Sequence, residues 1–361
     1  MRSYDLRQAD LDERVRQLVA DASGNQNADL VAEIITTALK LHRDQPSRGD
    51  LRLVNTALKE IRYSMLVFSR HDEPKVTIYG SARSTPDDPN YHLSEEFARI
   101  MAQREWGVIT GAGPGVMEAG NKGAGPENSY GVNIRLPFEA NANGYLKPER
   151  TVNFKYFFTR KLGFVKESHA FAILPGGFGT LDEMFELLTL IQTGKSDLHP
   201  IVLLEAEGSG YWSQMLPFME EVLVGGGYIA AYDLNLFSVT SDPVAAADEL
   251  CHFYANYHSQ RYVGGILYLR LAEAPDDDTL ARLNEDYADI IVDQPLVVVE
   301  PSPEEIADDD ALDLDRVSFR FNRRGFGRLR ALVDELNDLV ITPAVVHPPS
   351  PMGEEQAERP W

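Results

Sequence analysis

A glycine-rich stretch carries the residue types best suited to bind a phosphate. It reads Pro175-Gly176-Gly177-Phe178-Gly179-Thr180-Leu181-Asp182-Glu183. An apolar run at residues 169–174 precedes it, and apolar residues at helical spacing follow it as far as Ile191. This order predicts a buried strand, a tight turn and a helix. The glycines let the backbone approach a ligand closely, and the N–H groups at the start of the helix then form an anion site.

Two side chains of this stretch could take part in chemistry. Thr180 can cap the helix or donate its hydroxyl to a bound phosphate. Glu183 lies one turn further along, so its carboxylate can reach back toward a ligand held by Gly176, Gly177 and Gly179. A structural alternative is a capping box, because Thr180-x-x-Glu183 has the required spacing. The spacing alone leaves both alternatives open.

Two further glycine-bearing turns follow predicted strands. Gly80-Ser81-Ala82-Arg83 follows the run at residues 76–79 and would place Ser81, and secondarily Arg83, near a ligand. Gly111-Ala112-Gly113-Pro114-Gly115 follows the run at residues 106–110 and opens a helix that carries Glu118. Ligands of parallel sheets bind at the carboxyl ends of the strands. The three turns therefore predict a single binding site.

The second of these turns lacks the spacing of a dinucleotide site. That fingerprint requires Gly-x-Gly-x-x-Gly, whereas the third glycine here, Gly115, comes one residue early. The next predicted strand ends in Arg135-Leu136-Pro137 and not in an acidic residue. The turn with Gly111 and Gly113 therefore favours close approach to a mononucleotide over an NAD enzyme.

Composition excludes several classes of function. The formal net charge of −22 repels nucleic acids and anionic membranes, so neither is expected as a partner. One cysteine, scattered histidines and the lack of a Gly-x-Ser-x-Gly motif predict no metal site and no serine nucleophile. Beyond the glycine-rich loop, nothing supports pyridoxal phosphate, so no cofactor is expected. No apolar run approaches the ~18 residues of a membrane span, and we expect a cytoplasmic protein.

Alternating strands and helices predict an α/β fold. We expect a Rossmann-like, mostly parallel sheet with helices on both faces at residues 75–257. A helical N-terminal extension is predicted at residues 1–74, and a small α+β unit of order β-α-β-β-α at 258–342. The acidic piece 303–310 is most simply a solvated loop, and residues 343–361 a disordered tail.

The sequence Pro-Gly-Gly-x-Gly-Thr-x-x-Glu resembles the signature of the LONELY GUY (LOG) proteins, long described as possible lysine decarboxylases. The basic pair Arg160-Lys161 precedes it by one predicted helix and one strand, as in that family. By itself, such a pair at a helix start is usually a solvated corner. Plant members read Met-His-Glu-Arg-Lys, whereas this chain reads Phe-Phe-Thr-Arg160-Lys161, so only the pair carries over. The resemblance is closer to the longer bacterial members.

The resemblance implies a nucleoside 5′-monophosphate phosphoribohydrolase. Such an enzyme hydrolyses the N-glycosidic bond of substrates such as a cytokinin riboside 5′-monophosphate or AMP, giving free base and ribose 5-phosphate. It implies Glu183 and Arg160 as catalytic residues and Lys161 and Glu118 as substrate-binding ones. It also implies a homo-oligomer, a dimer or larger. The preferred base stays open, as does the choice between Glu183 as general base and as electrostatic stabiliser.

A second hypothesis comes from a different class of protein. The same fold could bind a nucleotide or a phosphorylated cofactor without turnover, as a carrier or sensor. The presence of both Glu183 and Arg160 favours hydrolysis.

Overall fold

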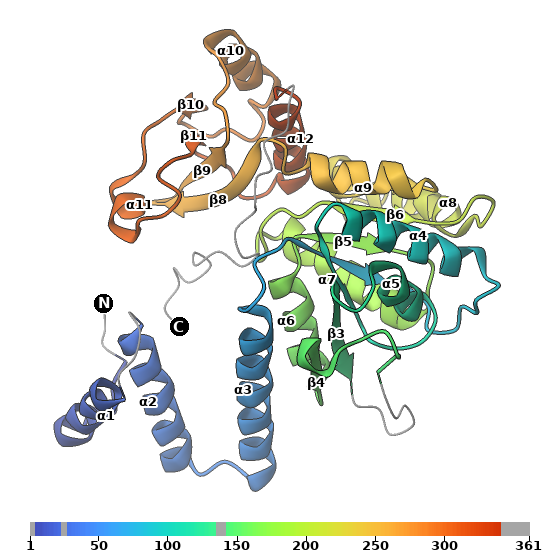
Figure 1. The fold of residues 1–361 in the computed structure, drawn as a ribbon. Coiled ribbons are helices and arrows are strands. Elements are labelled where there is room, and N and C mark those ends of the chain that lie inside the picture. Colours follow the sequence, from blue (N-terminus) through green and yellow to red (C-terminus); the bar gives the residue numbers. More distant parts are fainter. Residues whose placement is uncertain (1–3, 23–26, 135–141, 341–361) are drawn as a thin grey trace. The chain divides into compact units, whose positions relative to one another are not determined.

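The computed structural model describes residues 4–22, 27–134 and 142–340. The chain divides into two compact units, Met1–Arg62 and Tyr63–Trp361. The first unit consists of helices (Figure 1): α1 Ala9–Asp21, α2 Ala28–Asp44 and most of α3 Arg48–Phe68. Helices α1 and α2 contact each other. The predicted helical character of the N-terminal region is thus confirmed.

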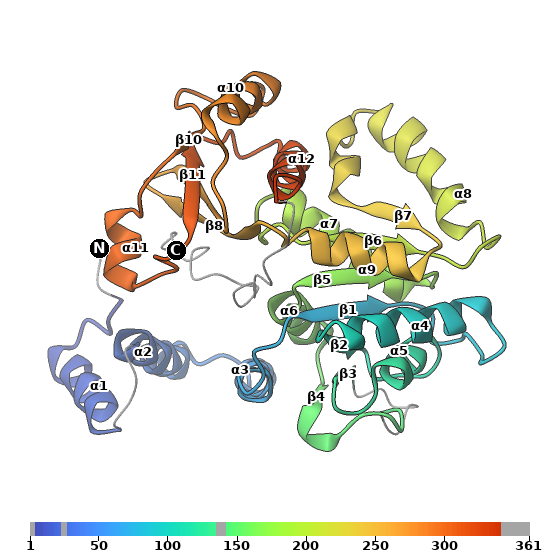
Figure 2. The same cartoon turned by 45° about the horizontal axis from the view of Figure 1, so that its top comes forward.

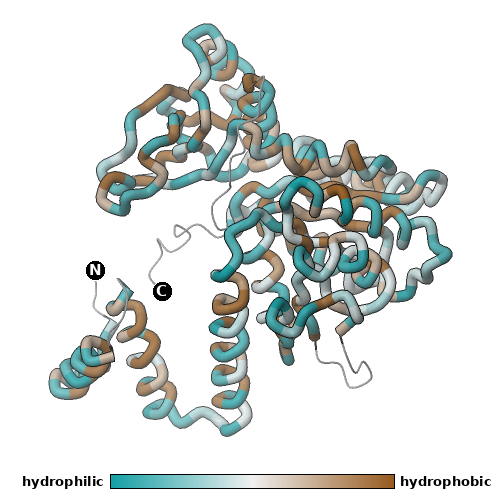
Figure 3. Tube along the Cα trace, viewed as in Figure 1, coloured by the Kyte–Doolittle hydropathy of each residue, from teal (hydrophilic) through white to brown (hydrophobic). Residues whose placement is uncertain are grey.

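A seven-stranded sheet lies at the core of the second unit. Its strands are β1 Lys75–Tyr79, β2 Gly107–Thr110, β3 Ser129–Ile134, β4 Thr151–Phe154, β5 Ala170–Ile173, β6 Ile201–Leu204 and β7 Ser238–Thr240. They lie in the order β4-β3-β2-β1-β5-β6-β7, and every neighbouring pair is parallel. Strands β1, β2, β5 and β6 are buried at every position, and these strands are largely apolar (Figure 3). The predicted mostly parallel sheet is confirmed.

Helices cover the sheet on both faces, as a parallel sheet requires. Helices α4 Pro89–Gln103, α5 Val116–Ala124 and α9 Pro243–His252 lie together (Figure 2). The crossovers through α6 Phe157–Glu167 and α7 Phe178–Gln192 run in the opposite direction along the sheet, which places these two helices on the other face. After β6 come α8 Tyr211–Pro217, the π-helical turn Phe218–Val224 and the 3-10 helix Ala231–Leu236.

The strand order reverses between β1 and β5. The chain builds β2, β3 and β4 outward on one side of β1, then crosses over through α6 to β5 on its other side. At such a point the loops after the two central strands diverge and leave a crevice at their carboxyl ends. Gly80-Ser81 follows β1, and Pro175-Gly176 follows β5. The topology therefore brings the predicted ligand-binding turns to the position where open α/β sheets bind ligands.

A second sheet, antiparallel and four-stranded, follows in the order β10-β11-β9-β8. Its strands are β8 Tyr257–Val263, β9 Ile266–Leu271, β10 Val297–Val298 and β11 Asp315–Phe319. The helices of this region are α10 Asp277–Asp286, α11 Pro303–Asp308 and α12 Phe326–Asn337. The Asn337 side chain accepts hydrogen bonds from the backbone N–H groups of Asn256 and Tyr257, at 3.1 and 2.8 Å, and so ties α12 to the start of β8.

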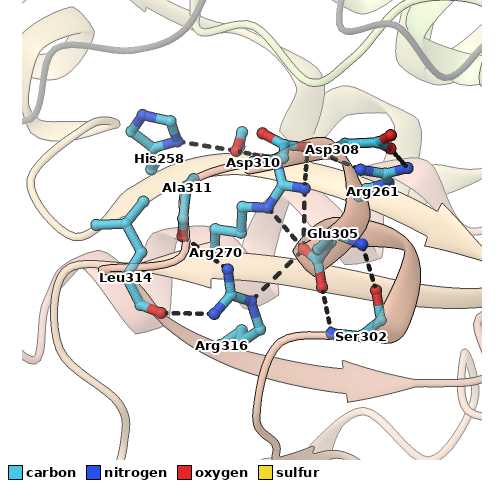
Figure 4. A network of polar contacts seen from close by, with 11 residues as sticks. His258, Arg261, Arg270, Ser302, Glu305, Asp308, Asp310, Ala311, Leu314 and Arg316 are labelled. Atoms are coloured by element: carbon cyan, nitrogen blue, oxygen red, sulfur yellow. Dashed lines mark hydrogen bonds and ion pairs between the residues drawn. The ribbon is translucent and has the colours of Figure 1, made fainter.

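Two details of this region differ from the sequence expectation. The structure has one strand more than the expected β-α-β-β-α order. This strand is β8, an edge strand whose polar composition gives no apolar run. The acidic piece 303–310 is not a solvated loop, because it contains α11 and a Glu305 side chain with no exposed surface. Figure 4 shows that Glu305 faces Arg270 and Arg316. The sequence positions 341–342 and 343–361 lie outside the described residues, as does the expected end of the third strand at 135–136.

Within residues 4–22, 27–134 and 142–340, no helix has the length and apolar character needed to cross a lipid bilayer.

Candidate functional site

A cavity of about 970 Å³ lies at the carboxyl ends of the central strands. Its size is at the upper end of the range typical of small-molecule sites. The lining comes from the turns after β1, β2 and β5 and from the starts of α6 and α7. Predicted site residues that line it are Ser81, Gly111, Gly113, Arg160, Gly176, Gly177, Gly179, Thr180 and Glu183.

The glycine-rich loop leads directly into α7. Gly177 is the N-cap residue, and no side chain caps the helix. The capping-box alternative for Thr180 and Glu183 is therefore wrong, because Thr180 already lies within the first turn. Its side chain packs against Gly176, where an added Cβ would overlap the Thr180 hydroxyl. Gly177 and Gly179 are exposed, and an added Cβ at either would meet open space, so the uncapped start of α7 is open to a ligand.

Hydrogen bonds hold the turns together around the cavity. The Ser81 N–H donates to the Pro175 carbonyl at 3.1 Å, which joins the turn after β1 to the loop after β5. The Val116 N–H donates to the Ser81 carbonyl at 3.0 Å. Gly115 has a φ of +71°, and a Cβ there would overlap the Ser81 carbonyl oxygen, so only glycine fits. The Tyr211 hydroxyl donates to the Gly176 carbonyl at 2.7 Å and anchors the loop from the other side.

Arg160 and Glu183 face each other in the cavity wall. The Arg160 Nη1 lies 3.5 Å from the Glu183 Oε1, and their side chains are 10% and 15% exposed. The Arg160 Nε donates to the Val132 carbonyl at 2.9 Å, and its Nη2 lies 3.5 Å from the Gly111 carbonyl. The guanidinium is thus fixed by the backbone of two strand ends. Arg160 therefore does not behave as a solvent-exposed basic residue at a helix start, which was the structural alternative for the Arg160-Lys161 pair.

Burial raises the pKa of the Glu183 carboxyl to about 7, although Arg160 and Lys161 act in the opposite direction. A carboxylate that loses water and gains few hydrogen bonds favours its neutral form. Among the described residues no hydrogen bond to this carboxylate is present, and Arg160 is its ion-pair partner. A group with a pKa near neutrality can exchange a proton at physiological pH, so it is suited to acid–base chemistry.

Lys161 is engaged by two acidic side chains of α7. Its Nζ forms ion pairs with Asp182 at 2.9 Å and Glu186 at 3.1 Å, and these contacts join α6 to α7. The side chain does not line the cavity, and neither do Gly115 and Glu118. Gly115 shapes the turn after β2, and Glu118 lies in the first turn of α5. Their assignment to substrate binding stays a prediction.

The cavity also has lining residues that the sequence reasoning did not select. Asp88 and Asn90 come from the start of α4, and Met117, Ile134, Phe157 and Phe178 form apolar parts of the wall. The Phe178 side chain is 94% exposed, so the glycine-rich loop presents an aromatic ring to the solvent side of the site. The alternation of glycines with one aromatic residue was visible in the sequence. No spacing pattern identified Asp88 or Asn90 as lining residues, because Asp88 caps α4 and Asn90 lies in its first turn, and single polar residues there carry no period.

Comparison with known proteins adds a family match over part of the chain. Residues 111–250 match the family model described as "Possible lysine decarboxylase". The cytokinin riboside 5′-monophosphate phosphoribohydrolase LOG1 of Arabidopsis thaliana is 42% identical over 67 residues, which is 19% of this chain and 30% of that protein. The LOG3 enzyme of the same plant is 40% identical over 67 residues, with the same shares covered. The chain thus spans about 30% of the length of these relatives.

Solved structures with similar chains were also found. A molybdenum cofactor carrier protein from Chlamydomonas reinhardtii is 19% identical, with a TM-score of 0.35 over 48% of this chain and 94% of that chain.

Proposed function

We propose that this chain is a nucleoside 5′-monophosphate phosphoribohydrolase of the LONELY GUY (LOG) family; the family match over residues 111–250 and the likeness to LOG1 support the proposal. The reaction adds water across the N-glycosidic bond and releases the free base and ribose 5-phosphate. One observation carries the proposal: a buried carboxyl with a pKa of about 7 faces a fixed arginine beside an open glycine-rich loop.

In this proposal the loop from Gly176 to Thr180 binds the 5′-phosphate. The accessible N–H groups near Gly177 and Gly179 and the N-terminus of α7 provide donors for an anion. Glu183 lies one turn further into the same helix. A phosphate held by the loop would therefore place the attached ribose close to the Glu183 carboxylate.

The ionised Glu183 carboxylate serves the bond-breaking step. As the base departs, C1′ gains oxocarbenium character, which a nearby negative charge stabilises. The same carboxylate can accept a proton from the attacking water, and a pKa of about 7 suits that transfer. In this proposal Arg160 is a positioning residue for the Glu183 carboxylate. Because two backbone carbonyls fix its guanidinium, it holds the carboxylate in place and favours its charged form.

The proposed substrate follows from the names of two related enzymes. LOG1 and LOG3 are named for cytokinin riboside 5′-monophosphate, so we propose an adenine base, either plain or substituted at N6. We also propose that the protein works in the cytoplasm as a homo-oligomer. The catalytic domain in this proposal spans residues 75–257, and residues 1–74 and 258–342 are attachments to it.

The test is a base-release assay with the purified protein and a panel of nucleoside 5′-monophosphates that includes AMP and an N6-prenylated AMP. Wild type is expected to release base from at least one substrate. Glu183→Gln is expected to lose about 100- to 10,000-fold of this activity, the usual effect of removing a catalytic acid–base group. Glu207→Gln changes the same chemical group on the exposed loop after β6 and is the control. Binding without release from any substrate would instead support a carrier or sensor.

A further inference from the structure

A positively charged side chain would strengthen phosphate binding in this acidic protein. The formal net charge of the chain is −22, so the surrounding surface opposes the approach of a nucleotide dianion. Two described residues that line the cavity carry a cationic side chain, Arg83 and Arg160. Lys161, the third cation near the site, is held by Asp182 and Glu186 outside the lining. Among the described residues, these three are the cations at or beside the cavity that could supply charge to a phosphate.

Arg160 is committed to other partners. Its guanidinium contacts Glu183, the Val132 carbonyl and the Gly111 carbonyl, at 3.5, 2.9 and 3.5 Å. A phosphate bound to this guanidinium would compete with Glu183 for its charge. Any loss of the Arg160 contact would leave the Glu183 carboxylate, with little exposed surface, short of its counter-ion, which is costly.

Arg83 combines a fixed backbone with an uncommitted side chain. Its N–H donates to the Ser81 hydroxyl at 3.0 Å, and Ser81 is itself bonded to Pro175 at the start of the glycine-rich loop. The residue is exposed, and no described residue forms a hydrogen bond or an ion pair with its guanidinium. The Arg83 backbone is thus tied to the loop that the proposed function assigns to the phosphate, while the charged end is available to a ligand.

We propose that Arg83 binds the 5′-phosphate and makes the site selective for nucleoside monophosphates over nucleosides. The inference rests on the proposed function for the identity of the ligand. An arginine and a phosphate form paired, charge-assisted hydrogen bonds that fix orientation as well as charge. Arg83 would supply the charge, and the N–H groups of the Gly176–Thr180 loop would supply the remaining donors. Arg83 is a binding residue in this assignment, and Glu183 remains the catalytic one.

The experiment compares Arg83→Gln and Arg83→Lys with wild type. The control is Arg99→Gln, which removes one positive charge from α4 at an exposed pair with Glu96. For each protein, kcat and KM are measured with a nucleoside 5′-monophosphate and with the matching nucleoside. We expect Arg83→Gln to raise the KM for the monophosphate about 10- to 100-fold, the usual effect of losing a charged hydrogen bond. Its kcat/KM for the nucleoside should stay within about twofold of wild type, and Arg83→Lys should fall in between.

Direct binding of ribose 5-phosphate, with ribose as the uncharged comparison, provides a readout that does not depend on turnover. If wild type binds ribose 5-phosphate more tightly than Arg83→Gln does, the assignment of Arg83 holds even if no substrate is hydrolysed. Equal binding of ribose 5-phosphate by wild type and Arg83→Gln would overturn the assignment. So would an equal loss of kcat/KM for monophosphate and nucleoside. If wild type binds no ribose 5-phosphate, both this assignment and the proposed function are wrong.

Discussion

Two glutamates with little exposed surface face arginines in this molecule, and they differ in how many hydrogen bonds their carboxylates accept. Glu183 has one arginine at 3.5 Å and opens onto a cavity. Glu305 has no exposed surface, and the Nε and Nη2 of Arg270 both lie 2.9 Å from its Oε1. The Arg316 Nε lies 3.5 Å from the same oxygen. The Ser302 N–H donates to the other carboxylate oxygen at 2.9 Å (Figure 4).

The pKa values of the two carboxyls shift in opposite directions. Burial raises the pKa of Glu183 to about 7, and the arginine does not reverse this effect. Burial also acts to raise the pKa of Glu305, but the hydrogen bonds from Ser302 and Arg270 outweigh it and lower the pKa below its usual value. The comparison teaches that donors, and not burial alone, decide the charge state of a buried carboxyl. Glu305 is a structural anion, whereas Glu183 is left able to exchange its proton.

The largest effect on stability is expected from Glu305→Ala. The change removes the carboxylate from the buried Arg316 and leaves Arg270 with Asp310 at 2.6 Å as its ion-pair partner. Breaking a buried pair typically costs 3–5 kcal/mol, so we expect a loss of about 3 kcal/mol. Denaturant unfolding followed by circular dichroism measures this free energy. Glu304→Ala, an exposed neighbour in α11, is the matched control and should change stability by less than about 0.5 kcal/mol. Equal stability of the two variants would refute the structural role of Glu305.

The stability that Glu183 contributes to the fold should decrease as the pH rises. Its folded-state pKa exceeds the unfolded value of about 4.5, so the folded protein binds more protons than the unfolded protein between these two values. Wild type should therefore lose about 2 kcal/mol of stability relative to Glu183→Gln as the pH rises from 5.5 to 8. The difference between the two proteins is measured by denaturant unfolding at several pH values. A difference that stays constant with pH would mean that the pKa of Glu183 is not raised.

Much of the sheet could be predicted from the sequence. Strands β1, β2, β5 and β6 are mostly apolar and buried at every position because both faces of a parallel sheet are covered. The glycine turns after β1, β2 and β5 could likewise be assigned to one site, because parallel strands place their carboxyl ends at one edge. In both cases a local pattern determines the structure: the topology confirms the parallel sheet, and the three turns line one cavity, whose role as a binding site stays a prediction.

The features that could not be predicted from the sequence depend mainly on contacts between residues that are distant in the sequence. Glu305 lies in an acidic run that resembles a solvated loop, and its partner Arg270 is 35 positions away. No local pattern shows that such an arginine will be opposite it. The spacing of Thr180 and Glu183 fitted a capping box, yet the helix begins at Phe178. The strand β8 was missed because an edge strand needs no apolar run.

The central claim, that Glu183 acts in its ionised form on a bound nucleotide, is tested most directly by the pH dependence of kcat/KM for base release. The account predicts an acidic limb with an apparent pKa of about 7, about one unit above the second ionisation of a phosphate group. Activity should rise tenfold per pH unit below that value and level off above it. A kcat/KM that is constant from pH 5.5 to 8.5 would contradict the assignment of Glu183 as the group that must lose its proton.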